Sequence, residues 1–202
     1  YRSEAQKQAL VGAARTQFPT AQQSVLGLFA QDEITFGAFT FTPGVRLDRF
    51  EQESPNGLND RSVDRVSPRV SLGWQVLPWM QPYVSYAEGF RAPSLTELYV
   101  GGQHFPGNVF VPNPNLRPEV SRNKEAGLNL RFADVLRDGD RLRIRLSAFR
   151  NDIDDFIEQT VLARTTVTRN IGQARITGVE AEAQYDAGTW WLGLGAAALK
   201  GD

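Results

Sequence analysis

The single histidine, His104, and the complete absence of cysteine limit the chemistry available to this 202-residue chain. Imidazole is the commonest metal ligand in proteins, and it titrates near neutral pH. One histidine excludes any site that needs two from this chain. The lack of cysteine excludes disulfides, cysteine-ligated zinc, iron–sulfur clusters and thiol catalysis. From spacing alone, a lone histidine in a polar segment is usually a solvated side chain, so its role depends on its neighbours.

Charge and motifs argue against an enzyme and against a nucleic-acid-binding protein. The chain carries 22 Lys+Arg and 23 Asp+Glu, a net charge of −1, without the basic excess that neutralises phosphates. It shows no nucleophile elbow, phosphate loop or metalloprotease signature. The acidic run Asp152, Asp154 and Asp155 lacks the spaced ligands and the glycine of a calcium loop, so we expect a solvated loop there.

Strict alternation of apolar and polar residues predicts an all-β fold, because such strands have one apolar and one wet face. In one segment Leu142, Ile144, Leu146 and Ala148 alternate with Arg141, Arg143, Arg145 and Ser147. The alternating segments are 24–35, 38–48, 69–76, 81–90, 125–132, 141–148, 178–185 and 189–200. About eight strands of roughly 10–12 residues exceed the usual length in soluble sheets and match a tilted membrane crossing. No helix is predicted.

Short and long connections alternate along the chain, as they do in outer-membrane β-barrels. Short links stand at 36–37, 77–80, 133–140 and 186–188, and long polar segments at 49–66, 91–122 and 151–173. No stretch approaches the apolar length of a membrane helix, and the mean hydropathy is −0.35. In a barrel the alternation produces this polarity, so we predict an antiparallel transmembrane β-barrel.

A barrel also assigns places to the charged and aromatic side chains. The charges on the polar faces, Arg131, Arg141, Arg143, Arg145, Glu125, Glu180 and Glu182, would line the lumen. Four aromatic residues near predicted strand ends, Trp79, Tyr83, Trp190 and Trp191, would suit girdles at the membrane interfaces.

Three motifs stand in order around the long segment 91–122. They are Phe90-Arg91-Ala92-Pro93, then His104, then Asn113-Pro114-Asn115-Leu116. With them the chain resembles TonB-dependent outer-membrane receptors, specifically the branch that takes up haem or haemoglobin, which carries a FRAP box, a loop histidine and an NPNL box. Further similar runs are 67–71, 118–128, 148–155, 170–174 and 177–182, whereas residues 1–22 carry no such motif.

The resemblance implies a ligand role for the loop histidine. His104 would supply an axial nitrogen to haem iron, Phe105 and Phe110 would pack on the porphyrin, and Arg91 would pair with a propionate. Tyr99 is a less favoured phenolate ligand. The NPNL box also has a structural interpretation, since its proline and asparagines would shape the return of the loop. Likewise Pro93 would end a strand, because proline donates no ladder hydrogen bond.

The same resemblance implies a larger assembly. Residues 1–202 would be a portion of one barrel of about 22 strands that encloses an N-terminal plug absent from this chain. The chain starts at Tyr1 without a signal peptide, so both ends look cut. The expected partners are haem or a haemoprotein, outer-membrane lipid of a Gram-negative cell, and the TonB complex. Haem would be cargo, with no resident cofactor and no chemical turnover.

Three other interpretations remain open from the residues. One is a TonB-dependent receptor for a ferric siderophore or another nutrient, in which His104 is incidental. The second is a small structural barrel, an anchor or adhesin, since about eight strands can close on themselves. The third is a soluble carbohydrate-binding β-sandwich, because its strands alternate too.

Overall fold

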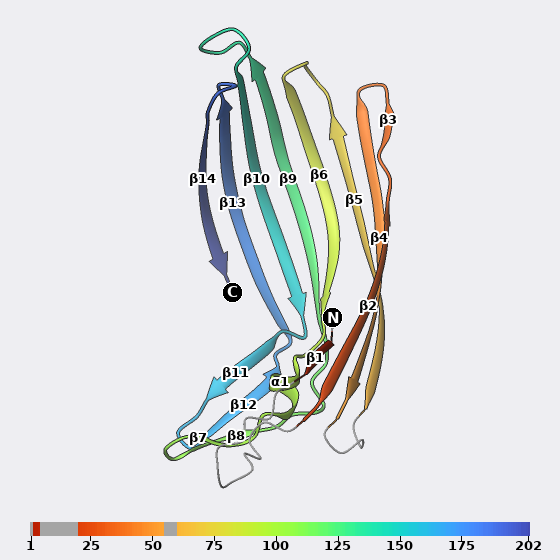
Figure 1. The fold of residues 1–202 in the computed structure, drawn as a ribbon, viewed down its shortest axis with the longest axis vertical. Helices are drawn as coiled ribbons and strands as arrows, with labels where there is room; N and C mark the ends of the chain where they lie inside the picture. Colours follow the sequence, from red (N-terminus) through yellow and green to blue (C-terminus); the bar gives the residue numbers. More distant parts are fainter. Residues whose placement is uncertain (1, 5–19, 55–59) are drawn as a thin grey trace.

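The structure, a computed structural model, describes residues 2–4, 20–54 and 60–202. Long strands lie side by side in one curved sheet, which we call the wall (Figure 1). Its strands are β1 (Arg2–Glu4), β2 (Gln22–Gln31), β3 (Ile34–Phe36), β4 (Phe39–Glu53), β5 (Arg61–Trp74), β6 (Met80–Arg91), β9 (Glu119–Ala133), β10 (Arg141–Asp154), β13 (Gln173–Asp186) and β14 (Trp191–Gly201).

The wall is an antiparallel sheet with the order β1-β2-β4-β5-β6-β9-β10-β13-β14. The short strand β3 follows β2 and pairs with the same neighbour, β4, so the eight predicted strands are all present. The sheet is open within the described residues, because β1 and β14 are its two ends. The small self-closed barrel is therefore not formed.

The predicted alternation is confirmed by the register of the strands. Leu128, Leu146, Ala181 and Ala196 are aligned across four neighbouring strands, which gives the wall an apolar face. One residue further along each strand, Asn129, Arg145, Glu182 and Gly195 are aligned on the opposite, polar face. Because neighbouring side chains alternate in direction, each strand contributes to both faces.

Toward the loop end, the face that is apolar elsewhere carries charged side chains. The strands continue into this charged part, where the alternation of apolar and polar residues stops, and they are therefore longer than predicted. Lys124, Arg150, Thr177 and Lys200 are aligned in one row, followed by Arg122, Asp152 and Arg175 in a second. Thus β4 and β9 reach 15 residues each, whereas about 9–11 residues suffice for a tilted crossing.

The prediction of aromatic girdles is wrong for two of its residues. Tyr83 is aligned with Gly127 on the polar face, and its hydroxyl contacts Glu125 there. Trp191 is aligned with Asp186 and, through it, with Arg141 on the same face. A shift of one residue in the register moves a side chain to the other face of the sheet, and the sequence pattern did not determine the register at the strand ends.

Short turns join the strands at one end of the wall, which we call the turn end (upper end in Figure 1). Gly37 and Gly188 have φ values of +57° and +82°, a region that favours glycine. In the turn 134–140 the Asp140 carboxylate accepts hydrogen bonds from the backbone N–H groups of Val135, Leu136 and Arg137 at 2.6, 2.9 and 3.0 Å. These links match the predicted short connections.

The other end of the wall, the loop end, carries structure that was not predicted. The elements there are α1 (Leu95–Tyr99), β7 (Gly102–Phe105), β8 (Asn108–Val111), β11 (Ile157–Val161) and β12 (Thr165–Asn170). The four strands form a second sheet in the order β11-β12-β8-β7, with β8 and β12 parallel (Figure 1). The expectation of no helix is therefore wrong, and the long polar segments contain four short strands that were not predicted.

The buried apolar core lies at the loop end. Its members are Ala21, Leu95, Leu98, Tyr99, Leu116 and Ile157. Most large apolar side chains of the wall are exposed instead, such as Leu28 at 62% and Leu194 at 67%. No helix in the described part of the chain is long and apolar enough to cross a membrane.

Candidate functional site

Two segments that are distant in sequence form one substructure at the loop end. We call residues 92–118 and 155–172 together the loop platform. The parallel pairing of β8 with β12 joins them, and the Thr166 hydroxyl donates to the Asn108 side chain at 2.8 Å across a separation of 58 residues. The FRAP box, His104 and the NPNL box all lie in this platform or at its junction with the wall.

Arg91 is held at that junction by two carboxylates. Its guanidinium donates to both oxygens of Glu119 at 2.6 and 2.7 Å and to those of Glu97 at 2.9 and 3.1 Å. Glu119 also accepts the backbone N–H of Ile157 at 2.8 Å. Because Glu119 belongs to β9, Glu97 to α1 and Ile157 to β11, this network ties the wall to both platform segments.

The other FRAP residues turn the chain from the wall into the helix. The Phe90 ring meets Phe50 edge to face at 5.0 Å, and Ala92 is half-buried. The Pro93 carbonyl is buried and accepts the Gln52 side chain at 2.6 Å. Ser94 then caps α1 in a capping box with Glu97, which satisfies two free backbone N–H groups.

The NPNL residues fasten the return of the first platform segment. Asn113 donates to the Thr168 carbonyl at 2.9 Å and accepts from the Asn115 backbone at 3.1 Å. Leu116 is fully buried in the core. The Arg61 guanidinium donates to the carbonyls of Leu116 at 2.5 Å and Pro114 at 3.3 Å. The four residues thus close the platform against β5 and β12.

His104 stands on β7 where the register of that strand is irregular. The register shifts between Gln103 and Phe105, and such bulges redirect side chains and are enriched beside functional sites. The half-buried imidazole packs on Phe110 at 4.5 Å between ring centroids, and Phe105 lies 5.9 Å from the same ring. We call these three residues the ring cluster.

The ring cluster combines the His104 imidazole with the apolar surface of two phenyl rings. His104 Nε2 lies 3.2 Å from the Gly101 carbonyl oxygen, and an iron bound at Nε2 would replace this contact. Phe105 is 56% exposed, so its ring is available to a ligand. The structure therefore brings His104, Phe105 and Phe110 together and places Arg91 apart from them, in the junction network.

Tyr99 and the acidic run have other surroundings. Tyr99 is buried in the platform core, and burial raises the pKa of its phenol, which opposes a phenolate ligand. Asp152 pairs with Arg150 and Arg175, and Asp155 pairs with Arg117 at 2.6 Å. Among the described residues no group of three or more acidic or histidine side chains could hold a metal ion.

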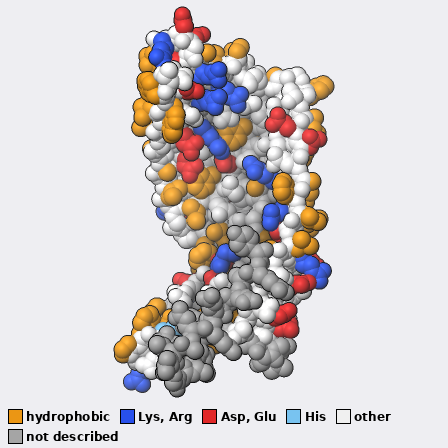
Figure 2. Space-filling view, in the orientation of Figure 1, with side chains coloured by type: hydrophobic (Ala, Val, Ile, Leu, Met, Phe, Trp, Pro, Cys, Tyr) orange, Lys and Arg blue, Asp and Glu red, His pale blue; other side chains and the backbone are white. Residues whose placement is uncertain are grey.

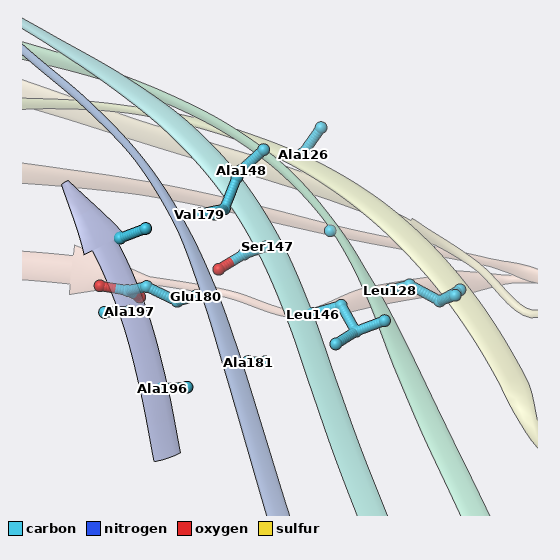
Figure 3. Close-up of a pocket in the computed structure, with 12 residues that line it drawn as sticks. Ala126, Leu128, Leu146, Ser147, Ala148, Val179, Glu180, Ala181, Ala196 and Ala197 are labelled. Carbon is cyan, nitrogen blue, oxygen red and sulfur yellow. The ribbon is translucent and has the colours of Figure 1, made fainter. Parts of the chain in front are cut away.

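A shallow hollow of about 610 Å³ lies on the wall across β9, β10, β13 and β14 (Figure 3). Eight of its twelve lining residues belong to the apolar face: Ala126, Leu128, Leu146, Ala148, Val179, Ala181, Ala196 and Ala198. Small alanines beside larger leucines leave this depression, which offers little polar surface for recognising a ligand.

Sequence reasoning missed Glu119, Gln52 and Arg61 as supports of the motifs. Glu119 lies in the similar run 118–128, but the partners of all three residues are 28 to 55 residues away in the chain, so no local pattern marks these contacts. The helix did have a local signal, because Ser94-Leu95-Thr96-Glu97 fits the capping-box pattern.

Comparisons with known proteins place this arrangement in context. The family described as "TonB dependent receptor-like, beta-barrel" matches residues 1–200. The chain is 37% identical over 162 residues to a heme/hemopexin utilization protein C of Haemophilus influenzae, covering 71% of this chain and 23% of that protein. It is 36% identical over 199 residues to a hemin receptor of Yersinia pestis, covering 92% and 29%.

Solved structures agree on the fold. The hemophore receptor HasR of Serratia marcescens, solved as a double mutant with its hemophore HasA and heme, superposes with a TM-score of 0.81 at 22% identity, over 93% of this chain and 35% of that one. The copper transporter OprC gives a TM-score of 0.68 at 22% identity, over 94% and 30%. The chain spans less than a third of the length of the curated relatives given above.

Proposed function

Because the chain belongs to the TonB-dependent receptor β-barrel family, we propose that it forms part of the wall and the ligand-capturing end of a receptor that takes up haem. The proposal is supported by the names of its relatives, a heme/hemopexin utilization protein and a hemin receptor. The whole receptor would sit in the outer membrane of a Gram-negative cell, where the apolar face of the wall meets lipid.

The observation that carries the proposal is the ring cluster, formed by two residues of the bulged strand β7 and by Phe110 of β8. An imidazole is a usual axial ligand of haem iron, and phenyl rings pack well on a porphyrin. His104 and the exposed Phe105 supply these groups with Phe110, whose ring centroid lies 4.5 Å from that of His104 and 5.9 Å from that of Phe105. We assign His104 as the iron ligand and the two phenylalanines as porphyrin contacts.

For Arg91 the proposed role is mainly to hold the platform that presents the ring cluster. Its charge is already matched by Glu97 and Glu119. A haem propionate could pair with Arg91 by displacing Glu97, the more exposed of the two carboxylates at 25% against 11%. The FRAP and NPNL residues would act in the same way, by fixing the two platform segments.

Uptake would be transport without chemical turnover. Haem, free or delivered by a haemoprotein, would be captured at the loop end and released on the other side of the membrane. The TonB complex would supply the energy through a plug that lies outside this chain. No resident cofactor is needed for these steps, since haem is the cargo.

The test is a haem titration of the whole receptor, followed by the Soret band. His104→Ala should weaken haem binding at least about tenfold, because an axial iron bond is lost, and should change the spectrum. Gln103→Ala, one residue away on the same strand, is the matched control and should leave both unchanged.

Two results would contradict the assignment. Unchanged affinity and spectrum in His104→Ala would remove His104 as ligand, and a spectral change in Tyr99→Phe instead would make the phenol the ligand. If the unaltered receptor binds a ferric siderophore and no haem, the siderophore alternative holds and His104 is incidental.

A further inference from the structure

The apolar face of the wall ends, toward the loop end, in a row of side chains that carries only positive charges. Its members are Lys124 of β9, Arg150 of β10, Thr177 of β13 and Lys200 of β14, and we call it the basic row. Neighbouring strands are about 4.8 Å apart, so the row spans roughly 14 Å. Because it lies on the face that would meet lipid, a plug inside the barrel would not cover it.

The apolar face ends differently toward the turn end. The last row there is Phe132, Leu142, Tyr185 and Leu192, with Trp79 stacked on Phe132 at 5.5 Å and Trp190 beside Tyr185 at 5.4 Å between ring centroids. From Leu142 to Arg150 the strand rises about 27 Å at 3.4 Å per residue, and a tilt of about 40° reduces this to about 21 Å across the membrane. Both rows therefore lie near the depth of lipid headgroups, and aromatic rings mark one and cations the other.

Acidic side chains do not neutralise the middle of the basic row. Lys124 is exposed, and no ion pair formed by the described residues includes it. Arg150 pairs with Asp152 at 2.8 Å, but Arg175 pairs with the same carboxylate at 2.7 Å. Three basic side chains therefore share one acid, which leaves an excess of positive charge beside the apolar face.

The excess is local. At the end of the row Lys200 pairs with Asp202 at 3.3 Å. On the polar face Arg145 pairs with Glu125 at 2.7 Å, and Figure 2 shows basic and acidic side chains close together on the wall. The uncompensated charges stand on β9 and β10, which have paired neighbours on both sides, so the open edges of the sheet do not account for them.

The apolar hollow of about 610 Å³ adjoins the basic row (Figure 3). The next row of the same face consists of Ala126, Ala148, Val179 and Ala198, one each beside the four members of the basic row, and all four line the hollow. Small side chains at this position leave room for an acyl chain directly below the cations. A lipid held by its headgroup at the basic row would therefore place an acyl chain in the hollow.

We infer that the basic row and the hollow together bind one lipid of the surrounding membrane, an anionic lipid whose headgroup carries phosphate groups. Basic side chains at a membrane surface attract anionic headgroups. The planar guanidinium of Arg150 suits bidentate contact with a phosphate, and Lys124 adds a second cation on the neighbouring strand. This inference rests on the proposed placement of the wall in an outer membrane and does not depend on haem.

The test titrates the whole receptor in detergent with two probes, lipid A that carries two phosphate groups and the same lipid A after their removal. Native mass spectrometry measures the fraction of receptor with bound lipid. Lys124→Gln with Arg150→Gln should weaken binding of the phosphorylated probe roughly 25-fold, at about fivefold for each charge. Binding of the dephosphorylated probe should not change. Lys124→Arg with Arg150→Lys keeps both charges and should retain most of the affinity.

The control is Arg49→Gln, which removes an arginine from the same face of the wall but on β4, where it pairs with Glu51 at 2.8 Å. It should leave lipid binding unchanged. Equal weakening for both probes, or unchanged binding in the double variant, would overturn the inference. So would binding of glucosamine phosphate, which has no acyl chain, as tightly as the lipid, because the ligand would then be a free phosphate. A receptor that binds no haem would contradict the proposed function and leave this result standing.

Discussion

The turn end and the loop end of the wall are held together in opposite ways. In the turn 134–140 the stabilising hydrogen bonds join residues three to five positions apart. At the loop end the bonds that close the platform join residues 53 to 58 positions apart. The turn 134–140 is therefore held mainly by local bonds, to which Tyr185 adds one from 45 residues away. The loop platform, in contrast, is closed only when distant segments have met.

The largest effect should come from the platform core. Leu116→Ala removes a fully buried side chain and should lower the free energy of unfolding of the platform by about 3 kcal/mol, through lost transfer energy and a cavity. Hydrogen exchange should show loss of protection in α1, β8 and β12 while β9 and β10 remain protected. Val161→Ala, at a side chain that is 68% exposed, is the control. Equal loss of protection in the wall would show that the two regions are one cooperative unit.

Next in size is the junction network. Glu119→Gln removes the charge that holds Arg91, and we expect a cost of about 2 kcal/mol, typical of hydrogen bonds to a charged group. Protease cleavage of the platform should become faster and haem affinity should fall, with the wall still resistant. Glu158→Gln alters an exposed pair with Arg169 at 3.4 Å and should do little. Identical cleavage of the two variants would show that the junction network does not stabilise the loop platform.

A smaller effect, confined to one turn, is expected from Asp140. Burial disfavours its charged form, but hydrogen bonds from Tyr185 and from the N–H groups of Leu136, Val135 and Arg137 outweigh it and lower the pKa to about 2. The folded pKa lies below the ordinary value of 3.8, so the stabilisation is present above that value and is lost as the pH falls toward 2.

In an amide NMR titration, Asp140→Asn should abolish this pH dependence for Val135 and its neighbours. Asp138→Asn, an exposed position in the same turn, serves as the control. Shifts that spread into the loop platform would show that the turn end is not self-contained.

The smallest effect should come from Gly139→Ala. The backbone of Gly139 has φ +84°, and a side chain in that region costs about 1 kcal/mol. Thermal unfolding in detergent should detect a modest decrease in Tm. Gly172→Ala at the loop end has open space and an ordinary φ, so no decrease is expected. If Gly172→Ala is the more harmful of the two, local backbone strain does not govern the turn end.

The wall could be predicted because lipid and water impose the same two-residue period on every strand. In β10 the even-numbered residues from Leu142 to Ala148 are apolar and the odd-numbered ones from Arg141 to Ser147 are polar. This alternation alone assigns the first set to the apolar face of the wall and the second to the polar face. Trp191 shows where the rule stops, since its face depends on one residue of register at the end of β14.

The site could be predicted only in part. The motifs around His104, Phe105 and Phe110 were recognisable, and the structure groups these three side chains. The bulge at His104 and the hydrogen bonds from Arg61 and Gln52 were not, because they depend on partners from another strand. The basic row also needed the register of its four strands before its members could be seen as neighbours.

The parallel pairing of β8 with β12 has a consequence for the time course of folding. The hairpins of the wall close over short turns. The strands β8 and β12, in contrast, are separated in the sequence by β9, β10 and their turn, so we expect them to pair only after β9 and β10 have formed. Contacts of such long sequence separation form slowly, because the loop-closure entropy must be overcome first. We therefore expect the wall to form before the loop platform, so that a partly folded molecule would have the wall yet lack the proposed haem-binding surface.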